Sequence, residues 1–194
     1  MTKTELLFAG FGGQGILLMG KITAQAAMTA GMQTTFLPSY GPEMRGGTAN
    51  CGVIVSDAPI ASPIVSRMDV LVAMNQQSLN KFGPLVREKG LIILDSTLAD
   101  PTQLAARRVR MVAGPFTKIA SDLGNVRAAN MVALGTLVRE TKFVQFDHMV
   151  EQMKKTTATK PELVALNTQA LEAGHQPSFP LKYTNPLHKQ WTLP

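Results

Sequence analysis

The chain has 194 residues, of which 45% are hydrophobic and 16% charged, and its formal net charge is +6 at pH 7. This length and composition predict one globular domain with a sizeable core. The basic residues are scattered and form no stripe interleaved with aromatic residues, which argues against nucleic-acid binding. The sequence shows neither a signal-peptide pattern nor an apolar run approaching the ~20 residues of a membrane span, so we expect a cytoplasmic protein.

The first feature in chain order is a glycine-rich turn after an apolar run. Residues 6–9 (Leu-Leu-Phe-Ala) predict a strand, and an apolar helix-like pattern begins at Ile16. The turn between them favours a close backbone approach to an anion at a helix N-terminus, as in the opening of a Rossmann-type unit. We therefore predict contact with a phosphate or with the backbone of a partner at Gly10, Gly12, Gly13, Gln14 and Gly15. A purely structural tight turn is the alternative.

The second strand, expected at residues 34–37, lacks the feature that dinucleotide binding needs. In that class of site, Asp or Glu ends the second strand and holds the ribose hydroxyl. Here the strand leads into Pro38-Ser39-Tyr40, and the first carboxylate, Glu43, comes late, inside a Pro/Gly loop. The sequence therefore argues against NAD(P) binding, although it leaves that reading open as an alternative.

Strands and helices alternate along the rest of the chain. We expect a long polar loop over 38–49, strands at 51–55, 70–74, 91–94 and 108–113, and helices at 76–86, 125–140, 146–155 and 162–173. This order predicts an α/β fold, namely a three-layer Rossmann-like domain with a mostly parallel sheet, over residues 1–174. Residues 175–194 are rich in proline and aromatic residues without periodicity. They predict an extended C-terminal arm that contacts another subunit or, equally, its own domain.

The remaining reactive residue types give little support for catalysis by this chain. The single cysteine, Cys51, excludes a disulfide within the chain and any iron–sulfur or zinc site that needs several thiolates. Its apolar neighbours predict a small buried side chain rather than a reactive thiol. His148, His175 and His188 share no metal-ligand spacing and are expected at the surface or in the arm. Asp95 is interpreted as part of a cap for the segment that follows it.

Five blocks of sequence resemble a known family. They are Phe-Gly-Gly-Gln-Gly-Ile at 11–16, Ser-Tyr-Gly-Pro-Glu-Met-Arg-Gly-Gly-Thr-Ala-Asn-Cys at 39–51, Ile-Ala-Ser-Pro at 60–63, Ala-Met-Asn-Gln at 73–76 and Asn-Met-Val-Ala-Leu-Gly at 130–135. With them the chain resembles the gamma subunit, or domain III, of the 2-oxoacid:ferredoxin oxidoreductases over about residues 4–140. The block at 39–51 resembles the 2-oxoglutarate and branched-chain or aryl 2-oxoacid members more than the indolepyruvate type.

The resemblance implies a thiamine-diphosphate-dependent complex that converts a 2-oxoacid to an acyl-coenzyme A and passes electrons through [4Fe–4S] clusters to ferredoxin or a similar acceptor. Because the chain has one cysteine and no Gly-Asp-Gly segment, thiamine diphosphate, Mg²⁺ and the clusters are expected on partner chains. The implied partners are alpha and beta subunits and a ferredoxin-like delta subunit.

Within this complex, the loop after the second strand is the best candidate for a contribution by this chain. Arginine suits a bidentate grip on carboxylate or phosphate, and paired glycines permit close approach. We predict that this loop and the glycine turn meet at the carboxyl end of the sheet, where they form or cover the channel for the 2-oxoacid and coenzyme A. The predicted residues are Tyr40, Glu43, Arg45, Gly46, Gly47, Thr48 and Asn50. Pairing of Glu43 with Arg45 that merely braces the loop is the alternative, as is a purely structural assembly subunit.

Overall fold

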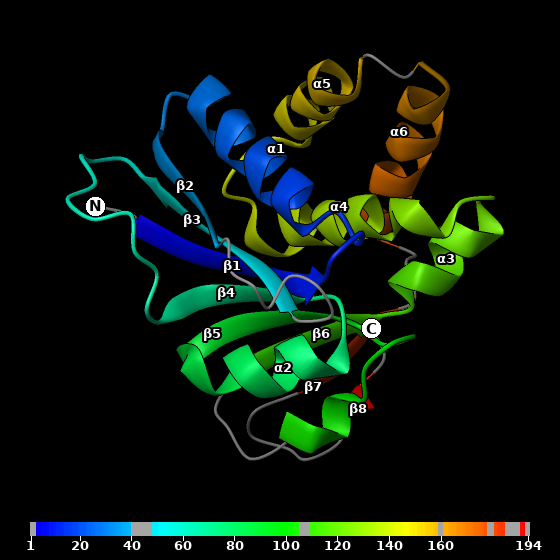
Figure 1. Cartoon of the computed structure of the whole chain (residues 1–194), viewed down its shortest axis with the longest axis horizontal. Helices are drawn as coiled ribbons and strands as arrows, with labels where there is room; N and C mark the ends of the chain where they lie inside the picture. Colours follow the sequence, from blue (N-terminus) through cyan, green and yellow to red (C-terminus); the bar gives the residue numbers. More distant parts are fainter. Residues whose placement is uncertain are drawn as a thin grey trace.

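One mixed β-sheet organises the molecule (Figure 1). The computed structural model describes residues 3–39, 48–104, 109–158, 161–177, 181–184 and 191–192. In this part of the chain eight strands lie in the order β2-β3-β1-β4-β5-β6-β7-β8. Their bounds are β1 Lys3–Phe11, β2 Gln33–Ser39, β3 Thr48–Ser56, β4 Met68–Ala73, β5 Val86–Asp95, β6 Arg110–Gly114, β7 Lys182–Thr184 and β8 Trp191–Thr192.

The centre of the sheet is parallel and its flanks are antiparallel. Strands β1, β4, β5 and β6 run in one direction, with Leu7 opposite Leu71 and Leu71 opposite Ile92. On one flank β3 lies antiparallel between β1 and β2, and on the other β7 and β8 continue the sheet in alternating directions. The predicted α/β, Rossmann-like class is confirmed, and its parallel pairs are confined to the central four strands.

Helices cover both faces of the sheet unequally. Figure 1 shows α1, α4, α5 and α6 together on one face, with α2 on the opposite face. The helices span α1 Ile16–Thr29, α2 Gln76–Phe82, α3 Phe116–Asp122, α4 Ala129–Thr141, α5 Phe146–Thr157 and α6 Pro161–His175, and short 3-10 turns are η2 Gly83–Leu85, η3 Pro101–Leu104 and η4 Val126–Ala128. None of these described helices is both long and apolar enough to cross a membrane.

The core forms two clusters because alternate strand residues point to opposite faces. Leu6 and Phe8 of β1 join the larger cluster beneath α1 and α4, whereas Leu7 joins the smaller one on the α2 side. In the thicker layer α4 and α6 approach closely, since a Cβ added to Gly135 or to Gly174 would collide with the backbone of the other helix.

Several expected elements differ from the structure at their ends. The helix expected over 76–86 stops at Phe82, and η2, which contains Pro84, leads directly into a longer β5. The helix expected over 125–140 begins as η4 and continues as α4. Helix α3, of seven residues, was not predicted. The helices expected at 146–155 and 162–173 are confirmed as α5 and α6.

Part of the predicted C-terminal arm adds to the sheet of its own domain. β7 pairs with β6 in the register Val112 opposite Tyr183. For residues 182–184 this matches the alternative in which the arm packs on its own domain. Contact between residues 175–194 and another subunit stays a prediction.

Candidate functional site

The glycine turn is a tight β-turn at the carboxyl end of β1. Gln14 N donates a hydrogen bond to Phe11 O at 3.2 Å, which places Gly12 and Gly13 at the tip. Gly13 has φ +92°, the left-handed value that a type II turn requires at its third position. Gly15 also has a positive φ, of +72°, and α1 begins at the next residue. The first N–H groups of α1 therefore start directly behind an exposed glycine tip.

The side chain of Gln14 is bonded within the protein. Its Oε1 accepts hydrogen bonds from Phe11 N at 2.6 Å and from Asn75 Nδ2 at 3.3 Å, while its Nε2 donates to Met74 O at 3.1 Å. Asn75 in turn caps α2, since its Oδ1 accepts a hydrogen bond from Ser78 N at 2.8 Å. Sequence reasoning missed the bond between Gln14 and Asn75, although both residues lie in the sequence blocks at 11–16 and 73–76.

The start of β3 lies beside the glycine turn. Thr48 is opposite Phe11, and Ala49 is opposite Gly10. Asn50, the last of the predicted site residues, stands between Ala9 of β1 and Ser39 of β2. Thus the end of the predicted loop and the glycine turn meet at the carboxyl end of β1. Tyr40, Glu43, Arg45, Gly46 and Gly47 lie outside the described residues.

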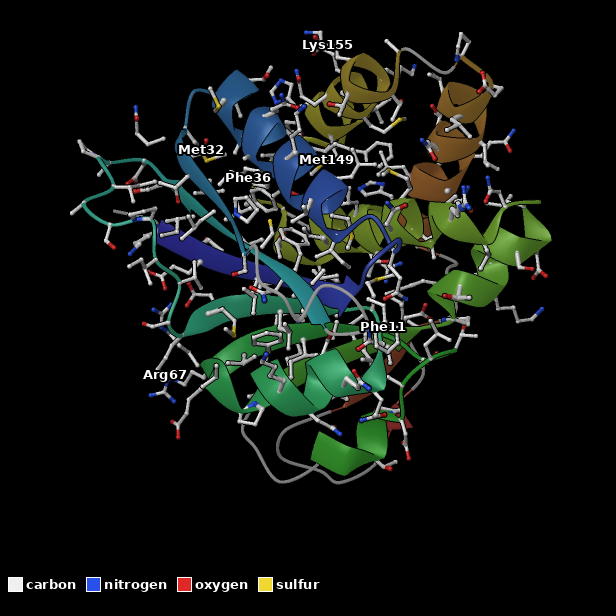
Figure 2. All side chains as sticks on the ribbon, viewed as in Figure 1. Phe11, Met32, Phe36, Arg67, Met149 and Lys155 are labelled. Atoms are coloured by element: carbon white, nitrogen blue, oxygen red, sulfur yellow. The ribbon has the colours of Figure 1, made fainter. Side chains whose placement is uncertain are left out.

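A hollow of about 280 Å³ adjoins the outer side of the turn. None of the described residues that line it carries a charge. Its walls combine glycine backbone with apolar side chains, among them the exposed ring of Phe11 (Figure 2). The lining residues are Phe11, Gly12, Gly13, Gly15, Ile16, Leu17, Leu18 and Ala49. Such a surface suits an apolar group that also carries hydrogen-bond acceptors for backbone N–H groups.

The sheet order bears on the dinucleotide alternative. In a dinucleotide-binding unit the strand beside β1 ends in the carboxylate that holds the ribose. Here β3 takes that place and runs in the opposite direction, so that its first residues, Thr48 and Ala49, stand beside the glycine turn. β2 and its end at Ser39 are one strand further away. The geometry therefore disfavours NAD(P) binding in the usual mode, for a reason beyond the lack of a carboxylate.

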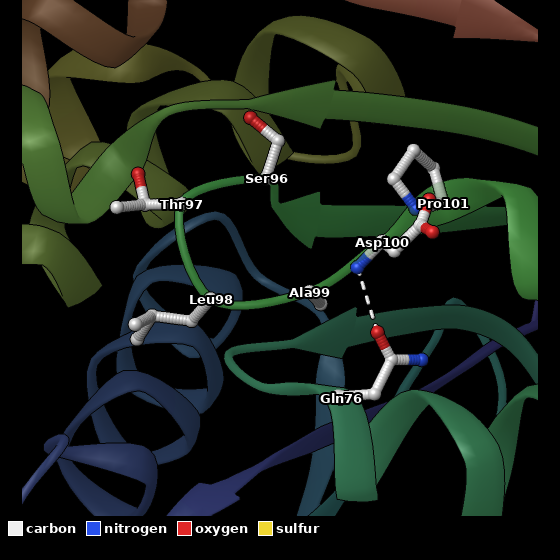
Figure 3. A pocket seen from close by; sticks show the side chains of 7 residues that line it. All are labelled: Gln76, Ser96, Thr97, Leu98, Ala99, Asp100 and Pro101. Carbon is white, nitrogen blue, oxygen red and sulfur yellow. Dashed lines mark hydrogen bonds between the residues drawn. The ribbon is translucent and has the colours of Figure 1, made fainter.

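A second hollow, of about 440 Å³, lies further along the same edge (Figure 3). It is lined by Gln76, Ser96, Thr97, Leu98, Ala99, Asp100 and Pro101. Gln76 Oε1 accepts a hydrogen bond from Asp100 N at 2.6 Å, which ties α2 to the loop after β5. The hollow is wide open and its walls are mostly one short loop. No ligand class is indicated by it.

Asp95, which ends β5, is fully buried beside this loop. Its carboxylate accepts hydrogen bonds from Thr97 N at 3.0 Å, from Thr117 N at 3.1 Å and from Thr117 Oγ1 at 2.5 Å. Burial raises the pKa of Asp95, and these hydrogen bonds oppose the increase. The interpretation of Asp95 as a cap for the following segment is confirmed, and it also joins β5 to the start of α3.

The other reactive residue types stand apart from this edge. Cys51 is fully buried against Gly20 of α1, and burial raises the pKa of its thiol to about 12, which confirms the expected inert side chain. His148 and His175 are half-buried on α5 and α6, and His188 lies outside the described residues. In the part of the chain that the structure describes, no group of three His, Cys, Asp or Glu residues is placed to hold a metal ion.

Comparison with known proteins identifies the family. The family described as pyruvate ferredoxin/flavodoxin oxidoreductase matches residues 5–176. The chain belongs to this family. It is 43% identical over 173 residues to ketoisovalerate oxidoreductase subunit VorA of Methanothermobacter thermautotrophicus. This match covers 89% of this chain and 36% of VorA. The chain thus spans only about a third of the length of that relative.

Two further oxidoreductase subunits match most of their own length. 2-Oxoglutarate synthase subunit KorC of Methanocaldococcus jannaschii is 38% identical over 149 residues, which cover 76% of this chain and 80% of KorC. The crystal structure of a keto/oxoacid ferredoxin oxidoreductase gamma subunit from Geobacter sulfurreducens is 32% identical, with a TM-score of 0.77 over 90% of this chain and 95% of that subunit. The resemblance seen in the sequence is confirmed.

Proposed function

We propose that this chain is the gamma subunit of a thiamine-diphosphate-dependent 2-oxoacid:acceptor oxidoreductase. The complex would oxidatively decarboxylate a 2-oxoacid to an acyl-coenzyme A and pass the electrons to ferredoxin or a similar acceptor. The observation that carries this proposal is the family match over residues 5–176, together with likeness to a gamma subunit over 95% of that subunit's length. The fold, which presents a glycine turn without a dinucleotide site, agrees with a non-redox role.

The cofactors of the reaction belong to partner subunits in this proposal. Iron–sulfur clusters need several thiolates, whereas the chain has one cysteine and that residue is buried. Thiamine diphosphate, Mg²⁺ and [4Fe–4S] clusters are therefore assigned to alpha and beta subunits and to a ferredoxin-like delta subunit. In VorA the matching segment makes up 36% of one polypeptide, which supports physical attachment of this domain to further parts of the enzyme.

We place the contribution of this chain at the carboxyl end of β1. The glycine turn, the first residues of β3 and the loop at 40–47 would form or cover the channel for the 2-oxoacid and coenzyme A. The support is that Thr48 and Ala49 stand opposite Phe11 and Gly10, next to a hollow with exposed glycine backbone. Backbone N–H groups at a helix start favour an anionic group such as a coenzyme A phosphate.

A matched pair of glycine variants tests this placement. Gly13 and Gly31 have φ values of +92° and +81°, and an added Cβ at either position meets nothing within 4 Å. Alanine at either site should cost a similar backbone strain of about 1–2 kcal/mol. In the assembled complex we expect Gly13→Ala to raise KM for coenzyme A about fivefold or more, with kcat retained, because only Gly13 lies at the proposed channel. Gly31→Ala, at the far end of α1, should leave KM unchanged.

Equal KM values for the two variants would remove the channel role and favour a purely structural assembly subunit. Arg45→Ala extends the same measurement to the loop, where we expect a raised KM for coenzyme A or the 2-oxoacid. The broader proposal is tested by native mass spectrometry of the chain purified with its neighbours, with iron and thiamine analysis. A chain that purifies alone, free of both, would contradict it.

A further inference from the structure

The carboxyl end of the sheet has one point at which a ligand crevice is expected. In open α/β sheets this crevice lies where two neighbouring parallel strands lead to helices on opposite faces. Here β1 leads to α1 on one face and its neighbour β4 leads to α2 on the other (Figure 1). The notch between the ends of β1 and β4 is therefore the expected crevice.

That notch is filled by the side-chain amide of Gln14. The amide bonds to both strands' ends, since it accepts from Phe11 N and donates to Met74 O. Below it Met74 N donates to Ala9 O at 2.9 Å, which joins the two strand ends directly. The filling is close: a Cβ added to Gly10 would lie 2.7 Å from Gln14 Oε1 and 3.0 Å from the Cβ of Met74.

The same amide shapes the exposed tip of the turn. Gln14 N donates to Phe11 O while Gln14 Oε1 accepts from Phe11 N, so backbone and side chain of one residue close the turn from both sides. Gly12 and Gly13 are left exposed, and their N–H groups make no hydrogen bond to any described residue. The turn thus leaves the backbone of Gly12 and Gly13 on the side of the hollow beside α1, which both residues line.

We propose that Gln14 is a positioning residue that closes the crevice between β1 and β4 and presents the Gly12–Gly13 tip to the coenzyme A channel. This inference rests on the proposed function. It assigns the contact surface to the outer side of the turn and to the adjoining hollow, in place of the crevice that nucleotide-binding relatives of this fold class use. Gln14 acts through the conformation of the turn and does not itself meet the ligand.

Three glutamine variants test the proposal in the full chain and in the assembled complex. Gln14→Met keeps the side-chain length without polar atoms, and Gln14→Glu keeps the acceptor oxygens but loses the donor to Met74 O. Gln33→Met, at the exposed start of β2, is the matched control. Amide hydrogen exchange of the peptide containing Phe11 reports the closure of the turn, because that N–H is held by Gln14 Oε1.

We expect exchange at Phe11 to rise about tenfold in Gln14→Met and less in Gln14→Glu, with no change in Gln33→Met. In the complex, KM for coenzyme A should rise about fivefold in Gln14→Met while kcat per assembled complex stays within about twofold. Unchanged exchange, or faster exchange with unchanged KM, overturns the positioning role. If the wild-type chain assembles with no thiamine-diphosphate-dependent subunit, the proposed function fails, and exchange in the chain alone still decides whether Gln14 closes the turn.

Discussion

The two edges of the parallel sheet differ sharply in chemistry. At the amino edge, charged side chains begin the strands and pair across them: Arg87 of β5 contacts Glu5 of β1 at 2.7 Å and Asp69 of β4 at 2.8 Å, and Lys3 also pairs with Glu5. At the carboxyl edge, the described residues that directly follow β1, β4, β5 and β6 are uncharged. Amides, hydroxyls and backbone groups make the contacts there, as between Gln14 and Met74. Figure 2 shows Arg67 and Phe11 at these opposite edges.

This contrast indicates that the carboxyl edge is the one suited to a partner or ligand. Paired charges remain compatible with water, and burying them in an interface carries a desolvation cost. Interface cores are depleted of charge and enriched in aromatic residues. The exposed Phe11, the glycine tip and the hollow, whose described lining residues carry no charge, give the carboxyl edge this character. Substitutions at the two edges should therefore differ in their effects on the free energy of unfolding and on KM in the complex.

The largest effect is expected from Gly10→Ala at the carboxyl edge. The added Cβ would lie 2.5 Å from Ile16 Cδ1 and 2.7 Å from Gln14 Oε1, in the closed notch. We expect a loss of about 2–3 kcal/mol in the free energy of unfolding, because both neighbouring side-chain ends are packed in the notch and must shift to make room. Urea denaturation of the chain measures this loss. Gly31→Ala, in open space, is the control, and an equal loss in both variants would contradict the close packing of the notch.

A smaller effect is expected from Glu5→Gln at the amino edge. The Glu5 side chain is 8% exposed, whereas that of Arg87 is 40% exposed and keeps its contact with Asp69. Because solvent screens the pair partly, we expect a loss of about 1–2 kcal/mol in urea denaturation. KM for coenzyme A in the complex should not change. Glu88→Gln, exposed on the same edge, is the control, and a raised KM in Glu5→Gln would place a ligand contact at the wrong edge for our proposal.

The carboxyl edge was partly predictable from the sequence. Apolar runs such as residues 6–9 and 91–94 are long enough to mark buried parallel strands, and the glycine run after the first of them marks a turn with positive φ. Together with the 39–51 block they gave the fold class, the family and the meeting of loop and turn. The strands and the turn depend on local sequence, and the meeting of loop and turn follows from the general rule that ligand loops gather at the carboxyl end of such sheets.

Features that depend on long-range contacts were missed. Nothing in residues 48–56 tells that β3 inserts between β1 and β2, because strand order is decided by packing across the whole sheet. Two partners of Gln14 lie about 60 residues away, so its amide was predicted to contact a ligand, whereas it bonds to Met74 and Asn75. β7 was read as part of an irregular arm, since three residues are too few for a period of two to appear.

Asp95 places a carboxyl group at the carboxyl edge itself, and its titration tests how this edge treats charge. The carboxylate is fully buried at the end of β5, and burial raises its pKa despite the hydrogen bonds from Thr117 and Thr97. In the unfolded chain an aspartate has a pKa of about 4. Between that value and the raised folded pKa, the folded state binds the proton more tightly than the unfolded state does. The contribution of Asp95 is therefore fully present below the unfolded pKa and is lost as pH rises through the folded pKa.

The smallest expected effect is therefore a change of the free energy of unfolding with pH. We predict that the stability of the wild type relative to Asp95→Asn decreases as pH rises through this window and is constant above it, when both are followed by urea denaturation at several pH values. Asp122→Asn, at an exposed position of α3, is followed in parallel as the control for the substitution itself. A wild-type advantage that grows with pH would mean that the buried site favours the anion. The carboxyl edge would then hold a stabilised negative charge beside the second hollow, and its uncharged character would end at β5.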